Sequence, residues 1–294
     1  MDKKTKTIPN LIGISGKIGS GKDTLGQIIA RELLLLNYKD DDSHFTDQLR
    51  GEFNPNISYT RSDGFLNKKY GDKLKDIVCI LIGCTREQLE DRVFKEKELG
   101  EEWWYYEEGN GFKFNYNDGF PKNEEEVTLV KLTPRKIMQL IGTECGRQII
   151  HPDIWVKALF ADYKAVKINN NTLLLSNPPQ QGFDLIKPKW IITDVRFPNE
   201  AQAIKDRGGI LIRVERPIDL RFPKLWKLYA SSNKYLSYSG GILAWLLGHD
   251  KEMSEKLNHP SEIALDDYEF DYVINNNGDL NELIKEFRNL SLIC

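Results

Sequence analysis

A glycine-rich segment follows the first apolar stretch of the chain, and it constrains the fold more than any other feature. Residues 11–15, LIGIS, indicate a short buried strand, and residues 16–24, GKIGSGKDT, match the phosphate-binding loop pattern G-x-x-x-x-G-K. Glycines let backbone N–H groups curl around phosphate oxygens, and the helix that follows adds positive potential at its N-terminus. The alternative is an ordinary glycine turn between a strand and a helix. The flanking elements favour a site for a nucleoside triphosphate.

The loop also predicts which residues hold ATP and its metal ion. Lys22 is placed to reach the β- and γ-phosphates, and we expect it to be a catalytic cation. Asp23 stands where serine or threonine usually ligates Mg²⁺, whereas Thr24 still offers a hydroxyl group. We therefore expect Mg²⁺ to arrive with ATP and to be held by Asp23, directly or through water, and by Thr24. The predicted ATP-binding residues are Gly16, Gly19, Gly21, Lys22, Asp23 and Thr24.

Length and charge limit the functional classes. The chain has 294 residues, of which 40% are hydrophobic and 29% are charged, values typical of a soluble globular protein. A net charge of −3 argues against a large nucleic-acid-binding surface, so we expect no stable binding of nucleic acid. The apolar runs at 33–36, 78–82 and 242–247 are too short to span a membrane.

The cysteines and the first residues indicate an intracellular protein. Cys79, Cys84, Cys145 and Cys294 form no C-x-x-C pair and have no histidine at zinc-finger spacing, so we expect reduced thiols. The segment MDKKTKTIPN leads straight into the first strand without the pattern of a secretory signal. We expect a cytoplasmic location.

The order of apolar segments predicts a parallel sheet. A helix over 22–36 follows the first strand, and a second strand covers 190–193. A helix over 199–207 and a strand over 210–214 follow, which completes a strand–helix–strand unit. A last strand at 271–274 and a helix over 279–290 end the pattern.

The segments between these elements are more varied. Residues 37–64 are polar and predict a long surface loop, and 169–189 predict a loop or an edge excursion. Helices are expected over 71–83, over 85–94 behind a Thr85–Gln88 capping box, from Thr133-Pro134 onward, and over 153–163. The aromatic segment 101–126 predicts a hairpin that packs its own rings, with base binding as the alternative.

Asp194 and Arg196 follow the strand at 190–193 and so lie at the edge of the sheet where ligands bind. A carboxylate there orients Mg²⁺ or its water in P-loop enzymes, and Arg196 would face the same crevice. The alternative is a salt-bridged pair that serves only the strand end.

Transfer to a nucleotide would also need cations for the acceptor phosphate. Candidates are Lys75, Arg92, Lys95, Lys97, Arg135, Arg147 and Arg196, each of which could equally be a solvated surface charge.

Several motifs in the same order resemble phage-type deoxynucleoside monophosphate kinases. They are GKDT, the run at 131–163, ITDVRFPNEA at 192–201 and HPSE at 259–262, joined by KLKD at 73–76 and the run at 86–99. The resemblance implies that ATP gives its γ-phosphate to a deoxynucleoside monophosphate of the dTMP, dGMP or modified dCMP class, in the host cytoplasm if the chain is viral. It predicts an α/β three-layer P-loop kinase fold with a central parallel sheet, as a single domain over 1–294. An acceptor region is expected at about 65–165 and a lid-like insertion at about 217–258.

The same resemblance implies a set of substrate-binding residues. Arg135 and Arg196 would clamp phosphates as catalytic residues, and Trp155 would form a wall beside the base or sugar unless it belongs to the core. Lys97 is a rival for the role of Lys95, because the repeat KEKE lets the register slip by two. The implied set is Leu74, Lys75, Lys95, Arg135, Gly142, Trp155, Asp194, Arg196 and Glu200.

Two other functional classes remain open at this stage. One is a P-loop kinase of another small acceptor or of a polynucleotide 5′-hydroxyl, for which Asp194 would be the base. The other is a non-enzymatic, ATP-gated interaction module that uses the apolar patch 242–247. That patch could also be a homodimer contact or the underside of the lid, in which Arg216 and Arg221 are candidate phosphate ligands.

Overall fold

The structure is a computed structural model that describes residues 8–38, 50–54, 59, 64–109, 111, 113–118, 127–164, 166–169, 172–174, 185–223, 227 and 257–290. The chain divides into two compact units. The first contains Met1–Lys69 and Phe160–Cys294, and the second is Tyr70–Leu159.

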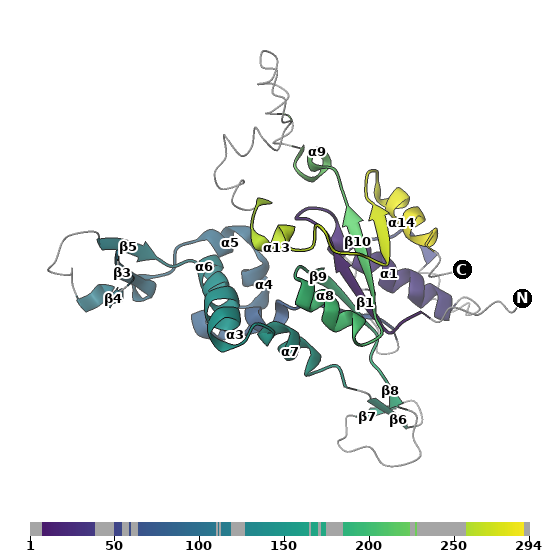
Figure 1. Cartoon of the computed structure of the whole chain (residues 1–294), viewed down its shortest axis with the longest axis horizontal. Helices are drawn as coiled ribbons and strands as arrows, with labels where there is room; N and C mark the ends of the chain where they lie inside the picture. The colour runs from purple at the N-terminus through teal and green to yellow at the C-terminus, as the bar shows by residue number, and fades with distance from the viewer. Residues whose placement is uncertain are drawn as a thin grey trace, which may run out of the picture. The chain divides into compact units, whose positions relative to one another are not determined.

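A parallel sheet forms the centre of the first unit. In the described part of the chain it has five strands in the order β11(Tyr272–Asn275), β10(Ile210–Glu215), β1(Leu11–Ser15), β9(Trp190–Val195) and β2(Leu66–Lys68). All neighbouring pairs are parallel. The sheet confirms the predicted α/β class and is consistent with a P-loop kinase fold. Strand β1 lies between β9 and β10 (Figure 1), so its carboxyl end opens at a point where the strand order reverses.

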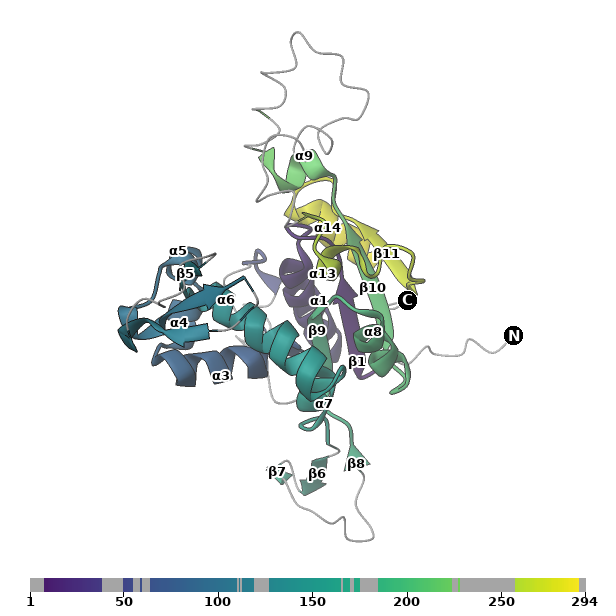
Figure 2. The same ribbon diagram turned by 60° about the vertical axis from the view of Figure 1, so that its left-hand side comes forward.

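Helices cover both faces of this sheet. Helices α1(Lys22–Asn37) and α14(Leu280–Arg288) pack together and share one hydrophobic cluster with Ile12 and Ile14 of β1. Gly13 points to the other face, where an added Cβ would lie 2.5 Å from Cδ1 of Ile204 in α8(Pro198–Lys205). The sheet is therefore the middle of three layers, as Figure 2 shows from a second side.

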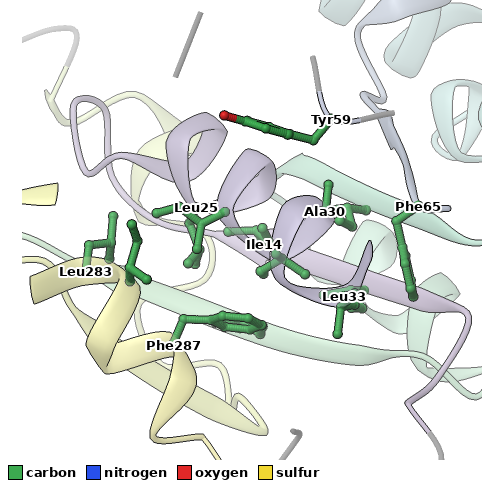
Figure 3. Packing of buried hydrophobic residues seen from close by; sticks show 14 of the residues in the cluster. Ile14, Leu25, Ala30, Leu33, Tyr59, Phe65, Leu283 and Phe287 are labelled. Atoms are coloured by element: carbon green, nitrogen blue, oxygen red, sulfur yellow. The ribbon is translucent and has the colours of Figure 1, made fainter. Parts of the chain in front are cut away.

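The core of the first unit corrects one expectation. Leu25, Leu33 and Phe287 pack over Ile14, as Figure 3 shows. Phe53 and Tyr59, from the segment predicted as a surface loop, belong to the same cluster and are only 6% and 8% exposed. The expectation is wrong for these residues, because isolated aromatic rings in a polar segment gain free energy by covering the core.

The second unit is built mainly from short helices. They are α3(Asp72–Ile82), α4(Arg86–Glu90), α5(Arg92–Glu96), α6(Pro134–Gln139), the π-helix η3(Leu140–Ile150) and the start of α7(Ile154–Phe160). In α3, Val78 is fully buried and Leu74 packs beside it, whereas Ile77 and Leu81 are 41% and 51% exposed.

The helix expected over 85–94 is interrupted. The capping box is confirmed, because Gln88 N donates to Thr85 Oγ1 at 3.2 Å and Thr85 N donates to Gln88 Oε1 at 2.9 Å. Asp91 then takes an extended conformation and accepts a hydrogen bond from Phe94 N at 2.7 Å. An aspartate that caps a following helix ends the preceding one, so α4 and α5 are separate.

Two small antiparallel sheets lie outside the central sheet. The order β4(Lys113–Asn115), β3(Trp104–Glu108), β5(Val127–Lys131) contains the predicted hairpin, and β7(Thr172–Leu174), β6(Val166–Asn169), β8(Leu185–Ile186) form the other sheet. The rings of Trp104 and Tyr116 pack edge to face with centroids 5.4 Å apart, and Lys131 lies over Trp104. Tyr106 also packs on Tyr116, as predicted for the rings of this segment, whereas Trp103 packs against the helical core of the unit.

Most of the predicted lid-like insertion, including the patch 242–247, lies outside the described residues. Helices α9(Ile218–Arg221) and α13(Pro260–Ile263) lie next to its two ends. Within the described ranges, no helix has both the length and the apolar character required to cross a membrane. Among the described residues, Cys79, Cys84 and Cys145 are free thiols, and Cys294 lies outside the described residues.

Candidate active site

The phosphate-binding loop joins β1 to α1 and depends on its glycines. Gly16, Gly19 and Gly21 have φ values of 156°, 76° and 95°, which glycine adopts readily and other residues rarely. A Cβ on Gly16 would lie 2.5 Å from Ser20 Oγ, and one on Gly21 would lie 2.6 Å from Asn276 Nδ2. The loop can therefore keep this shape only with glycine at these positions.

Backbone and side-chain bonds hold the loop around an open helix end. Ser20 N donates to Lys17 O at 3.1 Å, and Asn276 Nδ2 donates to Ser20 O at 2.8 Å. Gly21 is the N-cap of α1 and has no side chain that could accept from the first N–H groups of the helix. Among the described residues, the buried Ser20 Oγ has no hydrogen-bond partner. This donor set suits the oxygen atoms of a phosphate.

Lys22 lies folded against the loop. Its Nζ donates to Gly16 O at 2.5 Å and to Lys17 O at 2.9 Å. Burial and the nearby charge of Arg196 lower the pKa of Lys22 to about 8, against the opposing effects of Glu262, Asp23 and Asp194. One cation, Arg196, and three carboxylates therefore influence the Lys22 ammonium group. The anionic groups of a nucleotide would relieve the repulsion between Lys22 and Arg196.

Asp23 is held in its ionised form. Thr193 Oγ1 donates to Asp23 Oδ1 at 2.6 Å, and Lys69 Nζ lies 2.9 Å from the same oxygen. Burial alone would raise the pKa of Asp23, but the hydrogen bonds from Thr193 and Lys69 and the charge of Lys69 outweigh it and lower the pKa.

The oxygen atoms near Lys22 fit the chemistry of Mg²⁺ bound to ATP. The Asp23 and Asp194 carboxylates and the Thr24 hydroxyl are hard oxygen donors, and both carboxylates act on the charge of Lys22. Within the described ranges, no three His, Cys, Asp or Glu side chains form a group that could hold a metal on its own. Such a group is not required, because Mg²⁺ in phosphoryl-transfer sites binds one or two carboxylates together with the substrate phosphates.

Arg196 leaves the end of β9 beside this loop. Its Nη1 donates to Glu262 Oε1 at 2.9 Å and to Ser261 Oγ at 3.2 Å. Its backbone N donates to Glu200 Oε2 at 2.8 Å, and Phe197 N donates to the same oxygen at 3.1 Å. Glu200 is 2% exposed and fixes the turn into α8. A direct contact of Glu200 with substrate stays a prediction.

In the second unit, two of the cations predicted to bind the acceptor, Lys75 and Lys95, lie beside Glu90. Lys75 Nζ lies 2.5 Å from Glu90 Oε1, and Lys95 Nζ lies 3.7 Å from Glu90 Oε2. Burial lowers the pKa of Lys95, with contributions from the charges of Lys75 and Arg135, although Glu90 opposes them. Lys97 is exposed at the end of α5, so the geometry favours Lys95 in the cluster.

Three of the other predicted residues of this unit, Leu74, Gly142 and Trp155, meet at the π-helix. Trp155 Nε1 donates to Gly142 O at 2.8 Å, and a Cβ on Gly142 would lie 2.9 Å from Leu74 Cδ2. Trp155 is 4% exposed, which is the burial expected of a core residue. Its role as a wall beside base or sugar stays a prediction. Arg135 Nε lies 2.5 Å from Glu96 Oε1 on the surface of the unit.

The sequence analysis missed several residues that shape the first unit's site. Glu262 was part of the quoted motif HPSE, but nothing in its spacing assigned it a partner. Thr193, Lys69 and Asn276 reach the loop from distant parts of the chain, as the bonds to Asp23 and Ser20 show. No local pattern predicts such contacts, because they exist only after the sheet has formed.

Comparison with known proteins finds similar viral enzymes. No protein-family profile matches the chain. The deoxynucleoside-5′-monophosphate kinase of Escherichia phage T5 is 25% identical over 215 residues, which cover 68% of this chain and 73% of the phage protein. The putative deoxynucleotide monophosphate kinase of Acanthamoeba polyphaga mimivirus is 25% identical over 238 residues, covering 76% of this chain and 89% of that protein. The chain is thus similar, at low identity, to two viral proteins named as kinases of deoxynucleotide monophosphates.

Proposed function

We propose that the chain is an ATP-dependent deoxynucleoside monophosphate kinase, whose product is a deoxynucleoside diphosphate for DNA synthesis. The observation that carries this proposal is the loop from Gly16 to Lys22, with its positive-φ glycines and the open N-terminus of α1. The similarity to two viral proteins with that name supports the choice of acceptor. The fold alone would be compatible with many other acceptors.

The reaction needs positioning and charge more than covalent chemistry. An oxygen of the acceptor phosphate forms a bond to the γ-phosphorus of ATP, while the bond from that phosphorus to the β–γ bridging oxygen breaks and ADP leaves. The acceptor phosphate is already ionised, so no side chain has to remove a proton. Bound Mg²⁺ would supply positive charge to the β- and γ-phosphates, with Asp23, Thr24 and Asp194 as the residues that fit it.

The protein's own groups would stabilise the transferring phosphoryl group. Lys22 can leave its two loop carbonyls and bind the β- and γ-phosphate oxygens, and the first N–H groups of α1 can donate to them. Arg196, whose side chain is 38% exposed, can donate to the transferring or the acceptor phosphate. In the second unit, Lys75, Lys95 and Arg135 form a cationic set of the kind that an acceptor phosphate requires.

The test is the release of ADP from Mg·ATP across a panel of deoxynucleoside and ribonucleoside monophosphates. We expect one or a few deoxynucleotides, from the dTMP, dGMP or modified dCMP class, to stimulate ADP release. Lys22→Ala should abolish the stimulation, whereas Lys285→Ala, on the exposed side of α14, should retain it. Binding of ATP without stimulation by any monophosphate would reject the proposal.

A further inference from the structure

Two segments that are distant in the sequence meet at one residue of the phosphate-binding loop. Ile18 N donates to Glu262 Oε2 at 2.6 Å, and Ile18 O accepts from Arg221 Nη1 at 3.2 Å. Arg221 ends α9 and Glu262 lies in α13. Both polar groups of the Ile18 backbone are thus bound by side chains from elsewhere in the first unit.

The carboxylate of Glu262 also binds a second partner. Its side chain is 5% exposed, and its other oxygen, Oε1, accepts from Arg196 Nη1 at 2.9 Å. Ser261 Oγ, the neighbour in α13, lies 3.2 Å from the same nitrogen. One buried carboxylate therefore connects the backbone of the loop to the guanidinium at the end of β9.

Glu262 also affects the electrostatics of the loop, through its charge. The charge of Arg196 lowers the pKa of Lys22, whereas the charge of Glu262 raises it. Without the carboxylate, the guanidinium and the ammonium would repel each other across a partly desolvated site. Glu262 thus offsets the repulsion that would otherwise drive Arg196 away from the loop.

We propose that Glu262 is a positioning residue that holds the Arg196 guanidinium beside the phosphate-binding loop. It does not need to touch substrate, because it acts through Arg196. The effect on turnover rests on the proposed kinase function, in which Arg196 serves a phosphate. The placement of Arg196 itself does not depend on that function.

The first arm of the test is a double-mutant cycle on kcat/KM for the accepted monophosphate, with Glu262→Gln, Arg196→Ala and the double variant. Glutamine keeps the shape of the side chain and an oxygen for Ile18 N, but loses the charge that holds Arg196. Because a hydrogen bond to a charged carboxylate is stronger than one to a neutral amide, we expect Glu262→Gln to lower kcat/KM by roughly 10-fold or more in the wild-type background. In the Arg196→Ala background the same change should cost less than about 2-fold. Equal losses in both backgrounds would overturn the proposal.

A matched control comes from the same segment. Asp266 pairs with Lys17 and with Arg213, at 2.5 Å and 3.1 Å, so Asp266→Asn disturbs an anchor of the loop without removing the carboxylate bonded to Arg196. Its effect should be the same with and without Arg196. If Glu262→Gln does not fold, Ser261→Ala takes its place in the cycle. It removes a neutral hydroxyl from Arg196 Nη1, together with the contact of that hydroxyl with His259 Nδ1, which the Arg196→Ala background separates from the effect on Arg196. A Ser261→Ala effect that persists without Arg196 would count against the proposal.

The second arm needs no substrate. In the free protein, labelled with ¹⁵N-arginine, the Nε–H signal of Arg196 is assigned by its absence in Arg196→Ala. We expect Glu262→Gln to shift or broaden this signal and Asp266→Asn to leave it in place. An unchanged signal in Glu262→Gln overturns the positioning role, whatever happens to turnover. A wild-type protein without monophosphate-dependent turnover would instead reject the kinase proposal, and the signal would still decide the role of Glu262.

Discussion

At the scale of single residues, Lys22 gives the site a dependence on pH. Its pKa of about 8 in the free protein means that a substantial fraction of the amine is neutral at pH 8. Phosphate oxygens favour the ammonium form, so we predict that Mg·ATP binding takes up protons near pH 8 and weakens as pH rises above it. Calorimetry in two buffers of different ionisation enthalpy measures the uptake. Lys22→Arg should abolish the uptake, because guanidinium stays charged, and a wild-type protein without uptake would contradict the assignment.

The backbone at Gly21 supports a second prediction. Gly21→Ala places a Cβ at positive φ and 2.6 Å from Asn276 Nδ2, so both the loop and its anchor must shift. We expect a loss of stability of about 1–2 kcal/mol or more from the conformation alone and a loss of Mg·ATP binding, measured by thermal unfolding and titration.

Gly83→Ala is the matched control for that prediction. Gly83 also has positive φ, at 68°, but an added Cβ there meets nothing within 4 Å. We expect a similar conformational cost with Mg·ATP binding retained. If both variants lost Mg·ATP binding, or if both retained it, Mg·ATP binding would not depend specifically on the shape of the loop at Gly21.

The sequence predicts the residues that belong to motifs, but it does not predict the distant residues that hydrogen-bond to them. The glycines, Lys22 and Arg196 follow from patterns that chemistry restricts, and the structure gathers them in one unit. The roles of Glu262 and Asn276 depend on long-range packing, and a buried carboxylate cannot be told from a surface one by its neighbours in sequence.

At the scale of elements, helices α3, α5 and α6 each contribute one cation to the predicted acceptor site: Lys75, Lys95 and Arg135. The side chain of Arg135 is 46% exposed, and its charge, like that of Lys75, lowers the pKa of Lys95. We expect Arg135→Gln to raise KM for the monophosphate by about 10-fold, the worth of one charge-assisted bond, and to leave KM for ATP nearly unchanged. Lys113→Gln, on the exposed strand β4, is the control with the same loss of charge. If Arg135→Gln raised KM for ATP but not for the monophosphate, Arg135 would not be a ligand of the acceptor.

Long periodic elements were predictable, whereas several short ones were not. The helix α1 and the unit β9–α8–β10 follow from apolar spacing, and their bounds lie close to those expected. Strand β2 has only three residues, LNK, and exists because it pairs with β9. The π-helix and the break at Asp91 were missed for a related reason, since each depends on local hydrogen bonds that compete with a regular α-helix.

At the scale of the whole molecule, the central parallel sheet was predictable because its strands are apolar and alternate with helices. The sequence also indicated a region for the acceptor near the second unit, Tyr70–Leu159. That this region forms a compact unit of its own was not evident, because its core, around Val78, Leu89 and Ile137, is assembled from helices too short to show a long period.

The proposed reaction transfers the γ-phosphate from ATP to a deoxynucleoside monophosphate. The most direct measurement follows γ-labelled ATP, with Mg²⁺ and the stimulating monophosphate, and separates the products by chromatography. We expect the label to appear in the deoxynucleoside diphosphate, in amounts equal to the ADP formed, and we expect Lys22→Ala to yield none. Label found only in inorganic phosphate, or retained in ATP, would contradict it.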